Sequence, residues 1–141
     1  MGEREEPVWA NGDFTQRIGC ETMSVNEGVC EMALEVGPLH QSMAGRAHGG
    51  VLFTMLDTVM GRAVISKLPE GKGCATIEAK INYFRPVQSG RIVARATVPR
   101  TTRRTAYAEG VIVDEGGNEL ARASGTFMIT ETRLQTERER V

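Results

Sequence analysis

The positions of hydrophobic and polar residues mark one long apolar segment in the first half of this chain. Residues 51–65 contain four clearly polar positions, Thr54, Asp57, Thr58 and Arg62. A helix that is apolar on nearly every side must be surrounded by protein. We therefore predict a buried helix from about residue 49 to residue 66, which ends before the helix-breaking segment at residues 68–71.

Much of the remaining chain alternates between apolar and polar residues, as half-buried strands do. The predicted strands cover residues 18–25, 29–36, 75–84, 91–100, 107–113 and 119–129. Turn-forming residues separate the first two strands and the last two, so each of these pairs is predicted to form a hairpin. Residues 37–45 and 85–90 are predicted to be loops.

The order of these elements predicts one α+β domain, a curved antiparallel sheet of about five to six strands wrapped around one long central helix. A hairpin, a helix and then a run of strands differ from the alternating units of a doubly wound fold. The domain is predicted to span residues 17–130. Residues 1–16 would form an N-terminal arm or short helix, and residues 131–141, with three acids and three arginines, a frayed charged tail.

Composition limits the partners and compartments that this chain would use. Its 141 residues suffice for one domain with a real core, and its net charge of −1 gives no general attraction for nucleic acid or an anionic membrane. Arg62 interrupts the longest apolar stretch and the N-terminus lacks signal-peptide features, so we expect no membrane association. Cys20, Cys30 and Cys74 are widely spaced, without a CxxC pair, which predicts reduced thiols in the cytoplasm and no metal site.

Two glycines, Gly49 and Gly50, lie where the predicted helix begins. The first N–H groups of a helix have no intrahelical acceptor, and the helix dipole adds roughly half a positive charge there. Because glycine has no Cβ, a ligand can approach these donors closely. The pair therefore either permits tight packing of the helix end or binds an anion or a polarised carbonyl oxygen.

Asp57 is a carboxylate in the middle of the apolar segment. Its burial costs several kcal/mol unless it is hydrogen-bonded or paired, so it is either satisfied by a nearby Thr or Arg or acts as a nucleophile or general base. Gly49 and Asp57 would lie roughly 12 Å apart on one helix, too far for both to contact one carbonyl carbon. Two antiparallel helices related by a two-fold axis would bring Gly49 of one subunit near Asp57 of the other. This predicts an obligate homodimer with two shared sites.

The pattern His48-Gly49-Gly50-x-x-x-Thr54-x-x-Asp57 resembles the signature of hotdog-fold acyl-CoA thioesterases of the phenylacetic-acid-degradation type. The similarity covers about residues 30–130, since the strand at 75–84 and the break between Pro86 and Gly90 also match the family layout. The resemblance implies a sheet wrapped around one helix, in homodimers that often pair into homotetramers. It also implies hydrolysis of an acyl-CoA to the free acid and coenzyme A, with no metal or other cofactor.

The resemblance also assigns roles to individual residues. Gly49 would donate its N–H to the thioester oxygen, Asp57 of the partner subunit would attack the carbonyl carbon or activate a water, and Thr76 would orient that water. Many members carry Asn six residues before the histidine, where this chain has Ser42, a shorter side chain that would hold the thioester or the nucleophile differently. His48 would orient the loop through a ring hydrogen bond, with direct acid–base work as the alternative.

For coenzyme A, the resemblance points to arginines at the subunit surface and the strand ends. The candidates for phosphate contacts are Arg85, Arg100, Arg103 and Arg104. The alternative for the run from Arg100 to Arg104 is a solvated strand end. An aromatic or medium-chain acyl group would bind at the dimer seam, where the candidate contacts are Gly50, Phe53, Leu56 and Tyr83.

Three other functions fit parts of the pattern. A non-catalytic acyl-CoA-binding protein would use the same fold, although the 16-residue arm is too short for a DNA-binding helix-turn-helix. An acyl-thioester dehydratase or hydratase would place its Asp/His pair differently. In a purely structural domain, Asp57 would pair within its own subunit and side chains would cover the Gly49 N–H.

Overall fold

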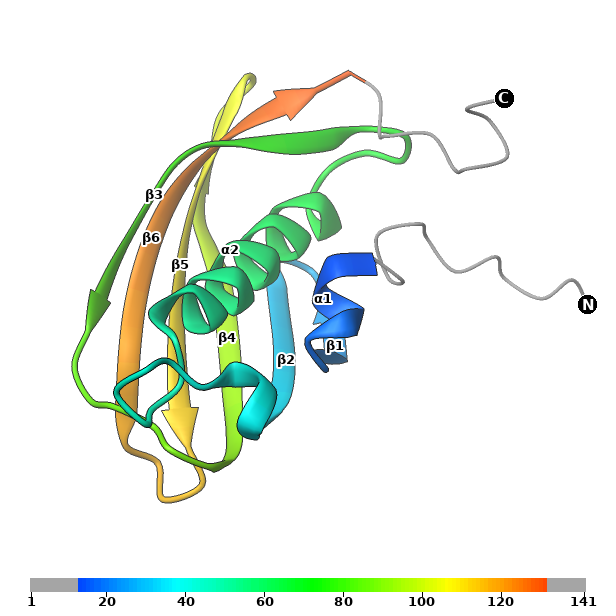
Figure 1. Ribbon diagram of the computed structural model, residues 1–141. Helices are drawn as coiled ribbons and strands as arrows, with labels where there is room; N and C mark the ends of the chain where they lie inside the picture. Colours follow the sequence, from blue (N-terminus) through cyan, green and yellow to red (C-terminus); the bar gives the residue numbers. More distant parts are fainter. Residues whose placement is uncertain (1–12, 132–141) are drawn as a thin grey trace, which may run out of the picture.

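One long helix lies across the concave face of a curved antiparallel sheet (Figure 1). The computed structural model describes residues 13–131, so the predictions for residues 1–12 and 132–141 concern segments outside the described residues. The elements are α1 (Asp13–Arg17), β1 (Glu21–Asn26), β2 (Val29–Val36), the 3-10 helix η2 (Pro38–His40), α2 (Gly49–Ser66), β3 (Gly73–Tyr83), β4 (Gly90–Thr101), β5 (Thr105–Asp114) and β6 (Glu119–Thr130). The predicted α+β class is confirmed.

The sheet contains six strands in the order β1-β2-β4-β5-β6-β3, and every neighbouring pair is antiparallel. The predicted hairpins β1–β2 and β5–β6 are confirmed. β3 precedes β4 in the chain but pairs with β6, which places it at the far edge of the sheet. This edge strand has 11 residues and, within the described chain, a neighbour on one side only.

The core lies between α2 and the concave face of the sheet. The buried apolar residues of α2 are Leu52, Met55, Leu56, Val59, Met60, Ala63 and Val64. Gly110 on β5 allows close approach, because a Cβ there would lie 2.9 Å from a methyl carbon of Leu56. Fully burying side chains of this size stabilises the fold by about 1.5–3 kcal/mol each.

The opposite face of α2 is less covered than the sequence suggested. Gly50 and Phe53 are exposed, and Thr54, Asp57 and Gly61 are half-buried. Asp57 is therefore not a core acid, because the sheet covers only one side of the helix within a protomer. By length and composition alone α2 could cross a membrane, but this protein uses it as the core helix against the sheet.

The buried charge of α2 is Arg62, whose side chain is 6% exposed. Its guanidinium donates a hydrogen bond to the hydroxyl of Thr22 on β1. Burial lowers the pKa of Arg62, an effect partly opposed by the nearby thiols of Cys30 and Cys20. Arg62 thus joins the helix to the sheet edge opposite β3.

Candidate active site

The start of α2 leaves one backbone donor without an acceptor. His48 is the N-cap residue, and its Nδ1 accepts a hydrogen bond from the N–H of Gly50 at 2.8 Å. The N–H of Val51 donates to the carbonyl of His48 at 2.9 Å. Between them, the N–H of Gly49 has no acceptor among residues 13–131. The predicted ring hydrogen bond of His48 is present, and it leaves Gly49 rather than Gly50 as the available donor.

Both glycines are also required by packing. A Cβ on Gly49 would lie 3.1 Å from the ring of Tyr83, and a Cβ on Gly50 would lie 2.9 Å from Nδ1 of His48. The hydroxyl of Tyr83 donates to the carbonyl of Gly49 at 2.7 Å, and burial raises the pKa of this phenol, which favours the donating form. Tight packing and an open N–H therefore coexist at Gly49.

The loop before α2 is held by a buried histidine, His40, which no sequence pattern singles out. His40 is 7% exposed; its Nδ1 accepts from the N–H of Gly37 at 2.9 Å, and its Nε2 lies 2.6 Å from the carbonyl of Ile18. Because Nδ1 accepts, the ring proton lies on Nε2 and is donated to Ile18. The carbonyl of His40 accepts from the N–H of His48 at 2.7 Å, so this residue helps to place the helix start.

Asp57 lies two turns further along α2, on the half-covered face. Its Oδ1 accepts a hydrogen bond from the hydroxyl of Thr76 on β3 at 2.8 Å. Because α2 is continuous, Gly49 and Asp57 of one protomer are roughly 12 Å apart along the helix. The predicted separation of donor and acid therefore holds within the protomer.

A β-bulge in the edge strand shapes the surroundings of Asp57. The pairing of β3 with β6 shifts between Thr76 and Glu78, which leaves Ile77 as an extra residue, 59% exposed. Cys74 lies two positions before Thr76, and its thiol contacts the carbonyl of Gly61 at 3.6 Å. Burial, and then the charge of Asp57, raise the pKa of Cys74 to about 11.

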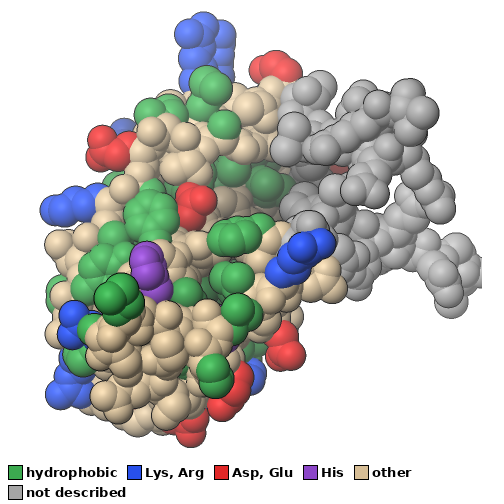
Figure 2. Space-filling view, viewed as in Figure 1, with side chains coloured by type: hydrophobic (Ala, Val, Ile, Leu, Met, Phe, Trp, Pro, Cys, Tyr) green, Lys and Arg blue, Asp and Glu red, His purple; other side chains and the backbone are tan. Residues whose placement is uncertain are grey.

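A cavity of about 530 Å³ opens at the start of α2, and we call it the helix-end cavity. Its lining comes from residues 46–50, Leu52 and residues 83–87. Five predicted site residues line it, namely His48, Gly49, Gly50, Tyr83 and Arg85. Arg46 and Phe84 are lining residues that the sequence did not single out. Figure 2 shows hydrophobic side chains gathered around an exposed histidine on this side of the molecule.

Two other predicted residues have a different environment. Leu56 is 1% exposed and belongs to the core, because it lies on the side of α2 that faces the sheet. It therefore does not present a surface to an acyl group. Ser42 lies in a turn in which its Oγ accepts from the N–H of Ala44 at 3.3 Å, as short hydroxyl side chains commonly do. No described contact joins Ser42 to Gly49 or Asp57. Phe53, 37% exposed, lies on the outer face of α2.

The predicted phosphate-binding arginines are divided between the two ends of the sheet. Arg85 lies in the loop before β4, next to the helix-end cavity, whereas Arg103 and Arg104 lie in the turn after β4. The 12 residues of β4 span roughly 35 Å. One protomer therefore does not bring Arg85 and Arg100–Arg104 to a single ligand.

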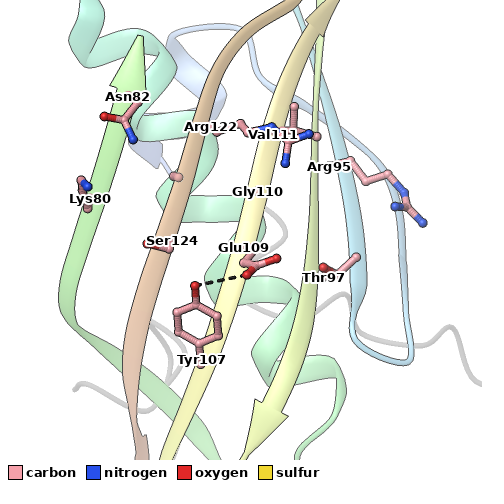
Figure 3. A pocket seen from close by; sticks show the side chains of 11 residues that line it. Lys80, Asn82, Arg95, Thr97, Tyr107, Glu109, Gly110, Val111, Arg122 and Ser124 are labelled. Carbon is pink, nitrogen blue, oxygen red and sulfur yellow. Dashed lines mark hydrogen bonds between the residues drawn. The ribbon is translucent and has the colours of Figure 1, made fainter. Parts of the chain in front are cut away.

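A second cavity, which we call the outer-face groove, lies on the face of the sheet away from α2 (Figure 3). It measures about 330 Å³ and contains none of the predicted site residues. Its Arg122 pairs with Glu119 at 2.5 Å, its Arg95 with Glu31 at 3.3 Å, and Tyr107 donates to Glu109 at 3.2 Å. The charges of this groove are thus largely balanced.

Comparisons with known proteins agree with this arrangement. A model of the family described as "Thioesterase superfamily" matches residues 44–121, which contain Gly49, Asp57 and Thr76. A protein of Halobacterium salinarum named as a candidate esterase is 31% identical over 126 residues, which cover 79% of this chain and 81% of that protein.

Two solved structures show the same fold. The phenylacetic acid degradation protein PaaI of Thermus thermophilus has a TM-score of 0.75 and 30% identity, with 82% of this chain and 96% of that chain covered. A Streptococcus pneumoniae protein described as a hypothetical thioesterase with coenzyme A has a TM-score of 0.74 and 25% identity, with coverage of 82% and 88%. The chain therefore belongs to the thioesterase superfamily, and it is a thioester hydrolase built on the hotdog fold.

Proposed function

We propose that this protein hydrolyses acyl-CoA thioesters at two equivalent sites, each shared between the subunits of a homodimer. The observation that carries the proposal is the placement of the open Gly49 N–H and the Thr76-bonded Asp57 on one helix, roughly 12 Å apart. The Gly49 N–H and the Asp57 carboxylate each supply half of a hydrolytic site, and within one protomer they are too far apart to act on the same carbonyl group. The Streptococcus pneumoniae relative, whose structure is described as containing coenzyme A, supports this choice of thiol.

The second copy would dock along β3. Among residues 13–131 this strand has no neighbour on its outer edge. It presents an exposed Ile77 and, beside it, the half-covered face of α2 with Phe53. An antiparallel arrangement about a two-fold axis would continue the sheet through β3 and bring Gly49 of one subunit to Asp57 of the partner subunit. It would also bring Arg85 of one subunit and the Arg100–Arg104 turn of the other to the same end of the shared site, where the arginines of the turn would contact the phosphates of coenzyme A. Pairing of two dimers into a tetramer is a further expectation from the family resemblance.

The chemistry follows from these positions. The Gly49 N–H donates to the thioester oxygen and stabilises the negative charge that develops on it, a contribution of about 3–4 kcal/mol for one such donor. Asp57 of the partner subunit either attacks the carbonyl carbon, forming a mixed anhydride that water then cleaves, or removes a proton from an attacking water. In both routes the carbon–sulfur bond breaks and the thiolate of coenzyme A takes up a proton. Thr76 holds Oδ1 of Asp57, which leaves Oδ2 available to act on the substrate or the water.

We assign supporting roles to the remaining residues. His48 caps α2 and thereby keeps the Gly50 N–H occupied and the Gly49 N–H open. Tyr83 holds the Gly49 carbonyl, and Phe53 and Tyr83 offer apolar surface to the acyl group. We also propose a cytoplasmic location, because Cys20, Cys30 and Cys74 are all free thiols.

The direct test is release of free thiol from a panel of acyl-CoAs, read together with absorbance for an enoyl product. Thiol release that disappears in Asp57→Asn supports hydrolysis at this site. An enoyl product would indicate a dehydratase, and tight acyl-CoA binding without any thiol release would indicate a non-catalytic binding protein. Single turnover in ¹⁸O-labelled water tests for direct attack. An anhydride that water cleaves at the Asp57 carbonyl leaves labelled oxygen in Asp57 and an acid without label, whereas water activation leaves one labelled oxygen in the acid and none in Asp57.

A further inference from the structure

The helix-end cavity carries positive charge that is not balanced within the described chain. Its lining includes two arginines, Arg46 and Arg85, and no Asp or Glu. Among residues 13–131, neither guanidinium forms an ion pair. The outer-face groove offers the contrast, since both of its arginines are paired with glutamates. Of the two cavities, the helix-end cavity is therefore the one that favours an anion.

Arg46 is the less compensated of the two cations. Arg85 lies close enough to Asp114 for its charge to contribute to a lowered pKa of that carboxyl, although hydrogen bonds from Asn118 contribute more. Arg46 forms no ion pair with an acidic residue in the described part of the chain. Its backbone is fixed, because its carbonyl accepts from Ser42 at 2.7 Å and the next residue, Ala47, donates to Val87 at 2.8 Å. The exposed side chain thus starts from a defined point three residues before Gly49.

We infer that the helix-end cavity binds an anionic group of the thioester substrate, with Arg46 as its principal contact and Arg85 as the second. This inference rests on the proposed function, in which the Gly49 N–H in the same cavity receives the thioester oxygen. The anionic group is a carboxylate or a phosphate, since both accept paired hydrogen bonds from a guanidinium. An anion here is a second point of recognition, separate from the reacting carbonyl.

The size of the cavity favours a carboxylate on the acyl group over a phosphate of coenzyme A. The cavity has the volume of a sphere about 10 Å across. The pantetheine arm has thirteen bonds between sulfur and the nearest phosphorus, and at roughly 1.2 Å per bond it extends about 15 Å. An anion that shares the cavity with the thioester carbonyl is therefore most simply the far end of a short acyl group. The substrate class would be coenzyme A thioesters of dicarboxylic acids.

The test measures affinity rather than turnover. The ligands are non-hydrolysable analogues in which a methylene replaces the thioester sulfur, with either a glutaryl or a pentanoyl group, which match in length and differ by one carboxylate. Each acyl group is presented on the full coenzyme A and on a truncated arm without phosphates. Calorimetry compares the wild type with Arg46→Gln, Arg46→Lys and a charge-matched control, Arg91→Gln, whose exposed side chain lies outside both cavities.

If the anion is the acyl carboxylate, Arg46→Gln weakens binding of both glutaryl analogues about tenfold and leaves both pentanoyl analogues unchanged. If it is a phosphate, Arg46→Gln weakens both full-length analogues and neither truncated one. Either result supports the anion site, and Arg46→Lys should retain part of the affinity. Equal affinities of Arg46→Gln and wild type for all four ligands, or an equal loss in Arg91→Gln, would overturn it.

Hydrolysis of the matching thioesters is measured separately. Charge-dependent binding without hydrolysis would reject the proposed function and leave the anion site standing. Hydrolysis accompanied by no effect of Arg46 on binding would reject this inference alone.

Discussion

The hydroxyl of Thr76 donates a hydrogen bond to Oδ1 of Asp57 at 2.8 Å, and this contact joins the edge strand β3 to the half-covered face of α2. The bulge at Ile77 follows directly, so the strand geometry changes where the acid is held. Oδ2 of Asp57 has no donor among the described residues. One oxygen of this carboxylate is thus fixed, and the other is left for chemistry.

We predict that Asp57→Asn lowers kcat by at least a hundredfold, because the amide can neither attack the thioester nor accept a proton from water. The variant should still fold, since its amide oxygen can accept the Thr76 hydrogen bond. Steady-state kinetics together with a thermal melt check both statements. Full activity of a folded Asp57→Asn on every acyl-CoA that the wild type hydrolyses would exclude this role for Asp57.

The matched pair Gly49→Pro and Gly49→Ala isolates the backbone donor. Proline is well tolerated at the first position of a helix, and His48 before it already has an extended backbone, so Gly49→Pro removes the N–H with little change of fold. Gly49→Ala introduces a similar contact with Tyr83 but keeps the N–H. We expect kcat to fall about 10²–10³-fold in the proline variant and far less in the alanine variant. Equal kcat losses in both would attribute the effect to packing.

The sequence predicted local elements well where hydrophobic period and turn residues agree. The ranges of α2 and β2 match the predicted helix at 49–66 and strand at 29–36. β1 begins at Glu21 rather than Ile18, because Gly19, at a φ of +88°, turns the chain after α1. Boundaries of the other strands differ by one or two residues, which reflects pairing partners that the local pattern does not contain.

Site features that depend on tertiary contacts are harder to predict from the sequence. The sequence pattern predicts a buried Asp57 and treats Arg62 as an interruption of the apolar segment. In the structure, the sheet covers the side of α2 that carries Arg62 and leaves Asp57 half-covered. Leu56, which the resemblance places at the dimer seam, lies in the core because it is on the sheet-facing side of α2. His40 and Arg46 gave no local signal, because their importance comes from partners such as Ile18 and from a cavity formed with β3. The Gly49–Asp57 spacing, by contrast, needs only helix geometry and could be read directly.

The thiol of Cys74 reports on the charge of Asp57. Its pKa of about 11 means that little thiolate exists near neutral pH, and alkylation in the native state should accelerate as pH rises toward 11. Asp57→Asn removes one of the two causes of this shift, so Cys74 should be alkylated faster at pH 9 in that variant. Cys20 and Cys30 serve as internal controls, since Asp57 does not contribute to their raised pKa values. Site-resolved mass spectrometry with no change at Cys74 would contradict the contact.

The same thiols set a stability trend at alkaline pH. Their pKa values are higher in the folded protein than the ordinary value of 9.0, because burial favours the protonated thiols. The free energy of unfolding therefore keeps its full value below pH 9 and decreases as pH rises toward 11. Replacement of all three cysteines by alanine should flatten this decline in chemical denaturation experiments. A wild-type stability that is constant between pH 8 and 11 would argue against it.

His40 is expected to stabilise the loop before α2. His40→Leu leaves the Gly37 N–H and the Ile18 carbonyl without their partners, at a cost of about 1–3 kcal/mol for each buried group. His40→Asn can keep an acceptor near Gly37 and should lose less. Urea denaturation measures both variants, and an unchanged free energy of unfolding in His40→Leu would show that these hydrogen bonds contribute nothing net.

Mixing of two defective variants tests the shared site most directly. Asp57→Asn and Gly49→Pro are each nearly inactive alone, but a mixed dimer contains one site built from the intact Gly49 of one subunit and the intact Asp57 of the other. After random subunit exchange, half of the dimers are mixed and each has one of two sites restored, so about a quarter of wild-type activity should return. Activity that stays at the level of the separate variants, although mass spectrometry shows mixed dimers, would contradict a site shared between subunits.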